Sequence, residues 1–232
     1  RASRTVPFVS TATGVPLAKL AAKVMVGKTL EELGFTREAE VKHVSVKESV
    51  FPFNRFPGVD TLLGPEMRST GEVMGIDHAF GIAFAKAELA AGQVLPRKGR
   101  VFISVKNRDK RAIIFIAKKL ADFGFRIVAT RGTAKALSQN GIAVEGVNKV
   151  HEGRPNIVDL IKSREIDLII NTSTGRRPKR DQGSIRSVAV AHNVPLITTI
   201  SGAAASVHGI EALLQEELQV KSLQEYHAMS NE

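Results

Sequence analysis

From Arg100 onward, short apolar runs alternate with segments whose apolar residues recur at helical spacing. Short apolar runs bounded by turn residues predict strands, and apolar residues three to four positions apart predict helices. The predicted strands cover residues 101–105, 126–129, 143–147, 167–170 and 196–198, and the predicted helices cover residues 112–120, 134–139, 157–162, 185–192 and 203–218.

Strands that alternate with helices through short loops pair in parallel, with right-handed crossovers. The pattern therefore predicts an α/β fold built on a doubly wound parallel sheet of about five strands. Ligands of such sheets bind at the carboxyl ends of the strands, so a site is expected in the loops that follow them.

The first ninety residues follow a less regular pattern. We predict a strand at residues 4–9, an apolar-striped helix at 16–27, and a helix that Asp77 caps and that buries Phe80 on its apolar side. The segment opens on an apolar stretch and is rich in proline, so we expect an α+β tail of a larger domain.

Glycine, proline and lysine gather in residues 91–99, which is typical of a linker. We therefore predict two domains, residues 1–91 and residues 92–232.

The composition is that of a globular protein, with 43% apolar and 24% charged residues among 232. No run of eighteen apolar residues occurs, so no membrane span is expected. Cysteine is absent, which excludes disulfides and cysteine-based zinc sites and fits a reducing compartment. We expect a cytoplasmic protein.

The net charge of +10 is concentrated in one part of the chain. Residues 1–91 carry 11 Lys/Arg against 10 Asp/Glu, whereas residues 92–232 carry 22 against 13. A local positive field attracts anions, from nucleic acid to a mononucleotide. With a single Tyr and no Trp, stacking on single-stranded nucleic acid is poorly supported, and a solvated basic surface is the plain alternative.

The sequence Thr-Arg-Gly-Thr at 130–133 lies between a predicted strand and a predicted helix. Backbone N–H groups converge at a helix N-terminus, Gly132 permits close approach, and the hydroxyls of Thr130 and Thr133 add donors, so a phosphate would fit here. A plain N-cap by Thr133 explains the same residues equally well.

The segment from Asn171 to Arg177 follows another predicted strand and should meet the first loop at the same sheet edge. Asn171 could bind a base or sugar, with Lys110 and Lys149 as candidate charges for the phosphate. The alternative is a polar turn with exposed arginines. His151 beside Glu152 is more typical of a structural hydrogen bond than of acid/base chemistry, and no pair of histidines or carboxylates has metal-site spacing.

Three long motifs resemble the large subunit of carbamoyl phosphate synthetase. They are Arg-Ser-Thr-Gly-Glu-Val-Met-Gly at 68–75, Thr-Val-Pro-Phe-Val-Ser at 5–10 and Val-Asn-Lys-Val-His-Glu-Gly-Arg-Pro at 147–155. The resemblance runs over nearly the whole chain and indicates a C-terminal piece of a longer subunit.

The resemblance implies a ligase that makes carbamoyl phosphate from bicarbonate, ammonia from glutamine and two ATP, for arginine and pyrimidine synthesis. That large subunit contains two ATP-grasp halves, uses ATP with Mg²⁺ or Mn²⁺, and works with a glutaminase small subunit. Residues 1–91 would close the second ATP-grasp domain. The ATP and metal ligands would lie upstream, so this piece is expected to hold no metal and to be inactive alone.

The resemblance also assigns residues to sites in this first part. Arg1 and Arg4 would stand at the phosphoryl and carbamate end of the active site, Lys47 and Glu72 along the carbamate tunnel, and Glu48, Leu63 and Thr198 near an ornithine site. Leu196 and Ile197 replace a Tyr-Asp pair associated with ornithine, which weighs against ornithine activation.

Residues 92–232 resemble the regulatory domain of the family, which shares the methylglyoxal synthase fold and binds UMP or IMP in bacterial enzymes. The resemblance places the phosphate at Lys110, Thr130, Gly132, Thr133 and Lys149, and the ribose and base at Asn171, Thr172 and Ser173. Arg131 replaces a histidine of some members and adds charge beside the phosphate.

Three other functions compete with this interpretation. A free-standing methylglyoxal synthase would need a carboxylate base, and the loop after Ile170 offers none before Asp181. The purine-synthesis cyclohydrolase domain that shares the fold does not suit residues 1–91. A nucleic-acid-binding module would show affinity that falls steeply with salt and no preference for mononucleotides.

Overall fold

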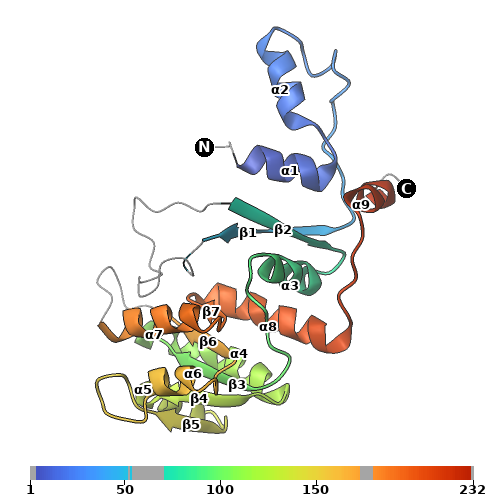
Figure 1. Ribbon diagram of the computed structural model, residues 1–232. Helices are drawn as coiled ribbons and strands as arrows, with labels where there is room; N and C mark the ends of the chain where they lie inside the picture. The colour runs from blue at the N-terminus through green and yellow to red at the C-terminus, as the bar shows by residue number, and fades with distance from the viewer. Residues whose placement is uncertain (1–3, 52, 54–70, 173–179, 231–232) are drawn as a thin grey trace.

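The computed structural model describes residues 4–51, 53, 71–172 and 180–230. Its centre is the predicted parallel sheet, with strand order β5-β4-β3-β6-β7 (Figure 1). The strands are β3 (Arg100–Ser104), β4 (Arg126–Thr130), β5 (Val144–Val147), β6 (Leu168–Asn171) and β7 (Leu196–Ile197). Every pairing in this sheet is parallel, which confirms the predicted α/β fold.

Helices cover both faces of this sheet. They are α4 (Lys110–Asp122), α5 (Arg131–Ser138), α6 (Ile157–Lys162), α7 (Arg180–Ala191) and α8 (Ile200–Gln215). Alternate residues of β3 point to opposite faces: Val101 and Ile103 pack with α4, α5 and α8, whereas Phe102 packs with α6 and α7. All three are fully buried, as expected for a strand inside a doubly wound sheet.

The predicted strand at residues 4–9 is wrong, because this segment begins the helix α1 (Thr5–Thr13). Its β-branched and aromatic residues favour a strand, but Pro7 lies in the first helical turn, where a missing N–H costs no hydrogen bond. Gly14, with φ of 74°, then ends the helix by donating its N–H to the Ser10 carbonyl. The predicted helix at 16–27 is confirmed as α2 (Leu17–Met25).

Two strands of the first part were not predicted. β1 (Val44–Val50) and β2 (Gly71–Asp77) pair antiparallel, and α3 (Phe80–Ala90) packs between them and α8. Figure 1 shows α3 between this hairpin and the parallel sheet unit.

Asp77 does not cap α3 as predicted, because it is the last residue of β2 and Ala79 holds the N-cap position without a side-chain bond. The Asp77 carboxylate instead pairs with Lys86 Nζ at 2.7 Å. Phe80 is 42% exposed, against prediction, whereas Ile82 is buried. Because α3 is enclosed on two sides, its buried residues spread around the helix and do not form one stripe.

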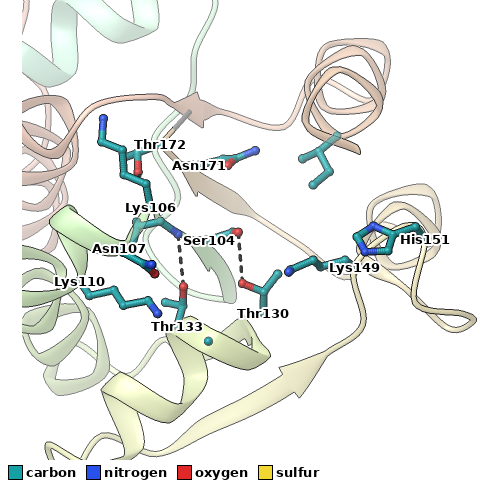
Figure 2. A pocket seen from close by; sticks show the side chains of 13 residues that line it. Ser104, Lys106, Asn107, Lys110, Thr130, Thr133, Lys149, His151, Asn171 and Thr172 are labelled. Atoms are coloured by element: carbon teal, nitrogen blue, oxygen red, sulfur yellow. Dashed lines mark hydrogen bonds between the residues drawn. The ribbon is translucent and has the colours of Figure 1, made fainter. Parts of the chain in front are cut away.

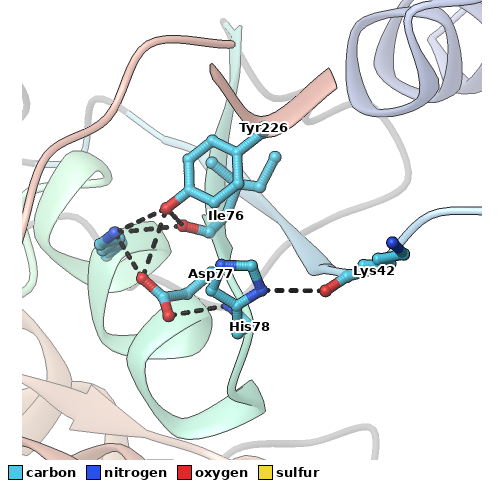
Figure 3. Close-up of polar contacts among 6 residues, drawn as sticks. Lys42, Ile76, Asp77, His78 and Tyr226 are labelled. Carbon is cyan, nitrogen blue, oxygen red and sulfur yellow. Dashed lines mark hydrogen bonds and ion pairs between the residues drawn. The ribbon is translucent and has the colours of Figure 1, made fainter. Parts of the chain in front are cut away.

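The final helix, α9 (Leu223–Ser230), was also not predicted, and it packs against the first part of the chain. Its Tyr226 is 2% exposed, and the hydroxyl donates to the Ile76 carbonyl at 3.0 Å (Figure 3). Lys86 Nζ donates to the same hydroxyl at 3.3 Å. The neighbouring His227 ring bonds the Thr11 carbonyl at 2.9 Å. Helix α9 is therefore hydrogen-bonded to β2, α3 and α1.

We expect Tyr226→Phe to lower the free energy of unfolding by about 1 to 2 kcal/mol, because a buried carbonyl and an ammonium lose a hydrogen-bonding partner. Urea unfolding measures this. Val220→Ala, at a 95% exposed position before the same helix, is the control and should change little. Equal stability of the Tyr226→Phe protein and the wild type would show that the network contributes nothing.

Among the described residues, no helix is long and apolar enough to span a membrane.

Candidate functional site

A cavity of about 550 Å³ opens where β3, β4 and β6 end (Figure 2). The last residues of these strands, Ser104, Thr130 and Asn171, all line it. The cavity brings together every predicted nucleotide-site residue that the structure describes. These are Lys110, Thr130, Gly132, Thr133, Lys149, Asn171 and Thr172. Ser173 lies outside the described residues.

The first turn of α5 forms one wall of the cavity. The helix begins at Arg131 with Thr130 as N-cap, so Thr133 is a residue of the first turn and the N-cap alternative for it is wrong. A Cβ placed on Gly132 would lie 3.2 Å from Lys110 Nζ, so the absence of a side chain lets the ammonium rest over this turn. Lys110 makes no ion pair with a described residue. A helix N-terminus and a nearby ammonium both favour an anion.

Hydroxyl groups connect the loops around the cavity. Thr133 Oγ1 accepts from the Val105 N–H at 3.3 Å, and Thr172 Oγ1 accepts from the Lys106 N–H at 3.1 Å. The Thr130 hydroxyl bonds that of Ser104 at 3.2 Å. Thr133 is 1% exposed and lines the cavity. Its hydroxyl also binds the residue that directly follows β3.

Asn171 carries an unsatisfied hydrogen-bond donor. Its side chain is 1% exposed and lines the cavity, and its Nδ2 has no hydrogen-bond partner among the described residues. Buried polar atoms in native proteins nearly always have partners, so an orphaned donor at a cavity indicates a missing acceptor. A ligand hydroxyl or carbonyl oxygen opposite the anion site would satisfy it.

Several lining residues were not predicted as site residues. They are Ser104, Val105, Lys106, Asn107, His151 and Ile185. Lys106 and Asn107 directly follow β3, so the rule that predicted the other strand-end loops could have found them. Ile185 belongs to the apolar side of α7, and no sequence signal marks it.

A second cavity, of about 250 Å³, lies between β1, α3 and β7. It brings together Glu48 and Thr198 of the predicted ornithine set, with Leu196 and Ile197 beside them, while Leu63 lies outside the described residues. Glu88 of α3 is a lining residue that the sequence did not reveal, and it is 7% exposed. Burial, and then the charge of Glu48, raise the pKa of Glu88 to about 7, and burial raises the pKa of Glu48.

The predicted tunnel residues are also neighbours. Glu72 pairs with both Arg4 and Lys47, each at 3.7 Å, and its side chain is 20% exposed. Arg1 lies outside the described residues. Among the residues that the structure describes, no group of three or more His, Asp or Glu could hold a metal ion.

The comparisons with known proteins agree with the fold. An MGS-like domain model matches residues 112–198. The chain is 57% identical over 226 residues to the carbamoyl phosphate synthase large chain of Nostoc sp., and 56% identical over 231 residues to that of Archaeoglobus fulgidus. The chain belongs to the carbamoyl phosphate synthase large-chain family.

These matches cover 97% and 99% of the chain but only 20% and 22% of the two relatives, so the chain spans about a fifth of their length. The matched region is their C-terminal part. A crystal structure of methylglyoxal synthase from Elizabethkingia anophelis is 20% identical, with a TM-score of 0.41, over 53% of this chain and 80% of that one. The family predicted from the three motifs is confirmed.

Proposed function

We propose that this chain is the nucleotide-sensing part of a carbamoyl phosphate synthase large chain and binds UMP or IMP in the cavity beside α5. The observation that carries the proposal is the pairing of an anion site with an orphaned donor. Lys110 lies over the first turn of α5, and Nδ2 of the buried Asn171, which lines the same cavity, has no hydrogen-bond partner among the described residues. A mononucleotide has both an anionic end and a polar sugar and base.

The phosphate would lie among the first-turn N–H groups of α5, Lys110 and Lys149. The sugar or base would then extend toward Asn171 and Thr172, and Ser173, the next residue in the sequence, is proposed to contact it as well. A volume of about 550 Å³ is within the usual range of small-molecule sites, roughly 300 to 1,000 Å³.

In the whole large chain the proposed activity is the ligase reaction that makes carbamoyl phosphate from bicarbonate, glutamine-derived ammonia and ATP with Mg²⁺ or Mn²⁺. A glutaminase small subunit would be the partner. Residues 1–91 would complete the second ATP-grasp domain and residues 92–232 would form the regulatory domain. Arg4, Lys47 and Glu72 would border the carbamate tunnel, which their mutual ion pairs support.

The ornithine site stays a proposal for Glu48, Leu63 and Thr198. The shared cavity supports it for Glu48 and Thr198, whereas the aliphatic Leu196 and Ile197 offer no side-chain polar group to an amino acid.

Methylglyoxal synthase chemistry is the alternative function of this fold. It needs a carboxylate within hydrogen-bond reach of the substrate carbon's proton. Among the described residues that line the cavity, none is Asp or Glu. This favours a binding site over a phosphate lyase.

Calorimetric titration with UMP, IMP and dihydroxyacetone phosphate tests the proposal. We expect UMP or IMP to bind, and Lys110→Ala to weaken binding about 30-fold, since a charged hydrogen bond contributes about 2 kcal/mol. Lys118→Ala removes an exposed lysine of the same helix and should leave affinity unchanged. Turnover of dihydroxyacetone phosphate, or no nucleotide binding, would contradict the proposal.

A further inference from the structure

Two of the lysines at the cavity are paired with carboxylates beside it. Lys106 Nζ lies 3.5 Å from Asp109 Oδ2, and Lys149 Nζ lies 3.7 Å from Glu152 Oε1. Lys106 and Lys149 come from opposite walls (Figure 2). Each wall therefore adds a negative charge next to a positive one.

Both carboxylates are held in place by further contacts. Asp109 ends the turn η2 (Asn107–Asp109), has a side chain 14% exposed and also pairs with Arg108 Nε at 3.7 Å. Glu152 accepts the Lys149 backbone N–H at 3.0 Å. That hydrogen bond, followed by the charges of Lys149, Arg131 and His151, lowers the pKa of Glu152, so it is ionised at neutral pH. Both carboxylates are therefore held beside lysines that line the cavity, without lining it themselves.

The charge of the ligand determines how strongly these lysines attract it and how strongly these carboxylates repel it. A phosphate monoester carries about two negative charges at neutral pH. Lys110 at the first turn of α5, with the two paired lysines, can balance such a group. A triphosphate anchored at the same turn would carry additional negative charge into the electrostatic field of Asp109 and Glu152, which lie beside the lining lysines Lys106 and Lys149. Coulomb repulsion grows with ligand charge, so the carboxylates penalise a triphosphate more than a monophosphate.

We propose that Asp109 and Glu152 set the charge selectivity of this site, so that it accepts nucleoside monophosphates and rejects nucleoside triphosphates. The inference rests on the proposed function, because it needs a nucleotide phosphate at the first turn of α5. Such selectivity would suit that function, because a regulatory site attached to an ATP-consuming enzyme works best if it does not bind the substrate ATP.

The test compares UMP with UTP, and IMP with ITP, by calorimetry without divalent cations, which would neutralise the triphosphate. We expect the wild type to prefer the monophosphates. Glu152→Gln keeps an acceptor for the Lys149 N–H but removes the charge. It should strengthen UTP binding about tenfold and UMP binding about threefold, with Asp109→Asn acting in the same direction. Glu211→Gln removes one carboxylate from an ion pair with Lys119 outside the cavity, so it controls for net charge.

The outcomes separate the two proposals. Failure of the wild type to bind UMP and IMP overturns the proposed function. If the wild type binds UMP, but binds UTP equally tightly, the selectivity inference is overturned and the proposed function stands. The same holds if Glu152→Gln and Asp109→Asn change the UTP to UMP affinity ratio no more than Glu211→Gln does.

Discussion

Gly75→Ala is expected to lower the free energy of unfolding by about 3 kcal/mol, as overpacking of a core does. A Cβ on Gly75 would lie 1.9 Å from the Ala83 carbonyl oxygen and 2.5 Å from the Ala87 nitrogen. Both atoms belong to the backbone of α3, so no side-chain rotation relieves the clash. The helix must move away from β2, and its packing on α8 must change with it.

Gly71→Ala is the matched control, because Gly71 lies in the same strand and a Cβ there would meet no atom of a described residue within 4 Å. Urea unfolding of the two variants isolates the clash from the general effect of losing glycine. If Gly75→Ala proved as stable as Gly71→Ala, the close approach of α3 to β2 would be wrong.

Glu88→Gln is expected to stabilise the protein by about 3 kcal/mol at about pH 8.5, since each pKa unit corresponds to about 1.4 kcal/mol and the Glu88 pKa rises from 4.5 to about 7. The folded state binds the proton more tightly than the unfolded chain. Wild-type stability therefore falls as pH rises from about 4.5 to about 7 and then levels off. The neutral glutamine avoids this loss.

Below about pH 4.5 the carboxyl is protonated in both states, so the variant and the wild type should be nearly equally stable. Thermal unfolding across this pH range measures the difference. Glu48→Gln should recover a smaller part of the stability, because the Glu48 charge is the lesser of the two causes. A difference between Glu88→Gln and wild type that does not vary with pH would contradict a buried, charged Glu88.

The parallel sheet could be predicted because its signals are local. Each strand is a short apolar run, and each helix has apolar residues three to four positions apart. The order of strands and helices from Arg100 to Gln215 could therefore be predicted without any knowledge of packing. The predictions for residues 1–91 were wrong where the structure depends on contacts between residues far apart in the sequence. β1 pairs with β2, which begins more than twenty residues later in the chain, and Asp77 bonds Lys86 instead of capping a helix.

The candidate site was predictable to the same extent. Thr130 and Asn171 end strands, and parallel strands bring their carboxyl ends to one edge, so their meeting followed from the fold. The position of Lys110 over Gly132 depends on how α4 and α5 pack, and the burial of Glu88 depends on α3 meeting β1. No spacing in the sequence encodes either contact.

The central claim is that the cavity beside α5 holds a mononucleotide, and a crystal structure of this chain with UMP or IMP tests it most directly. The account predicts nucleotide density with the phosphate at the first turn of α5 within reach of Lys110 Nζ, and a ligand oxygen bonded to the Asn171 amide. Nucleotide bound elsewhere, or an empty cavity at saturating nucleotide, would contradict it.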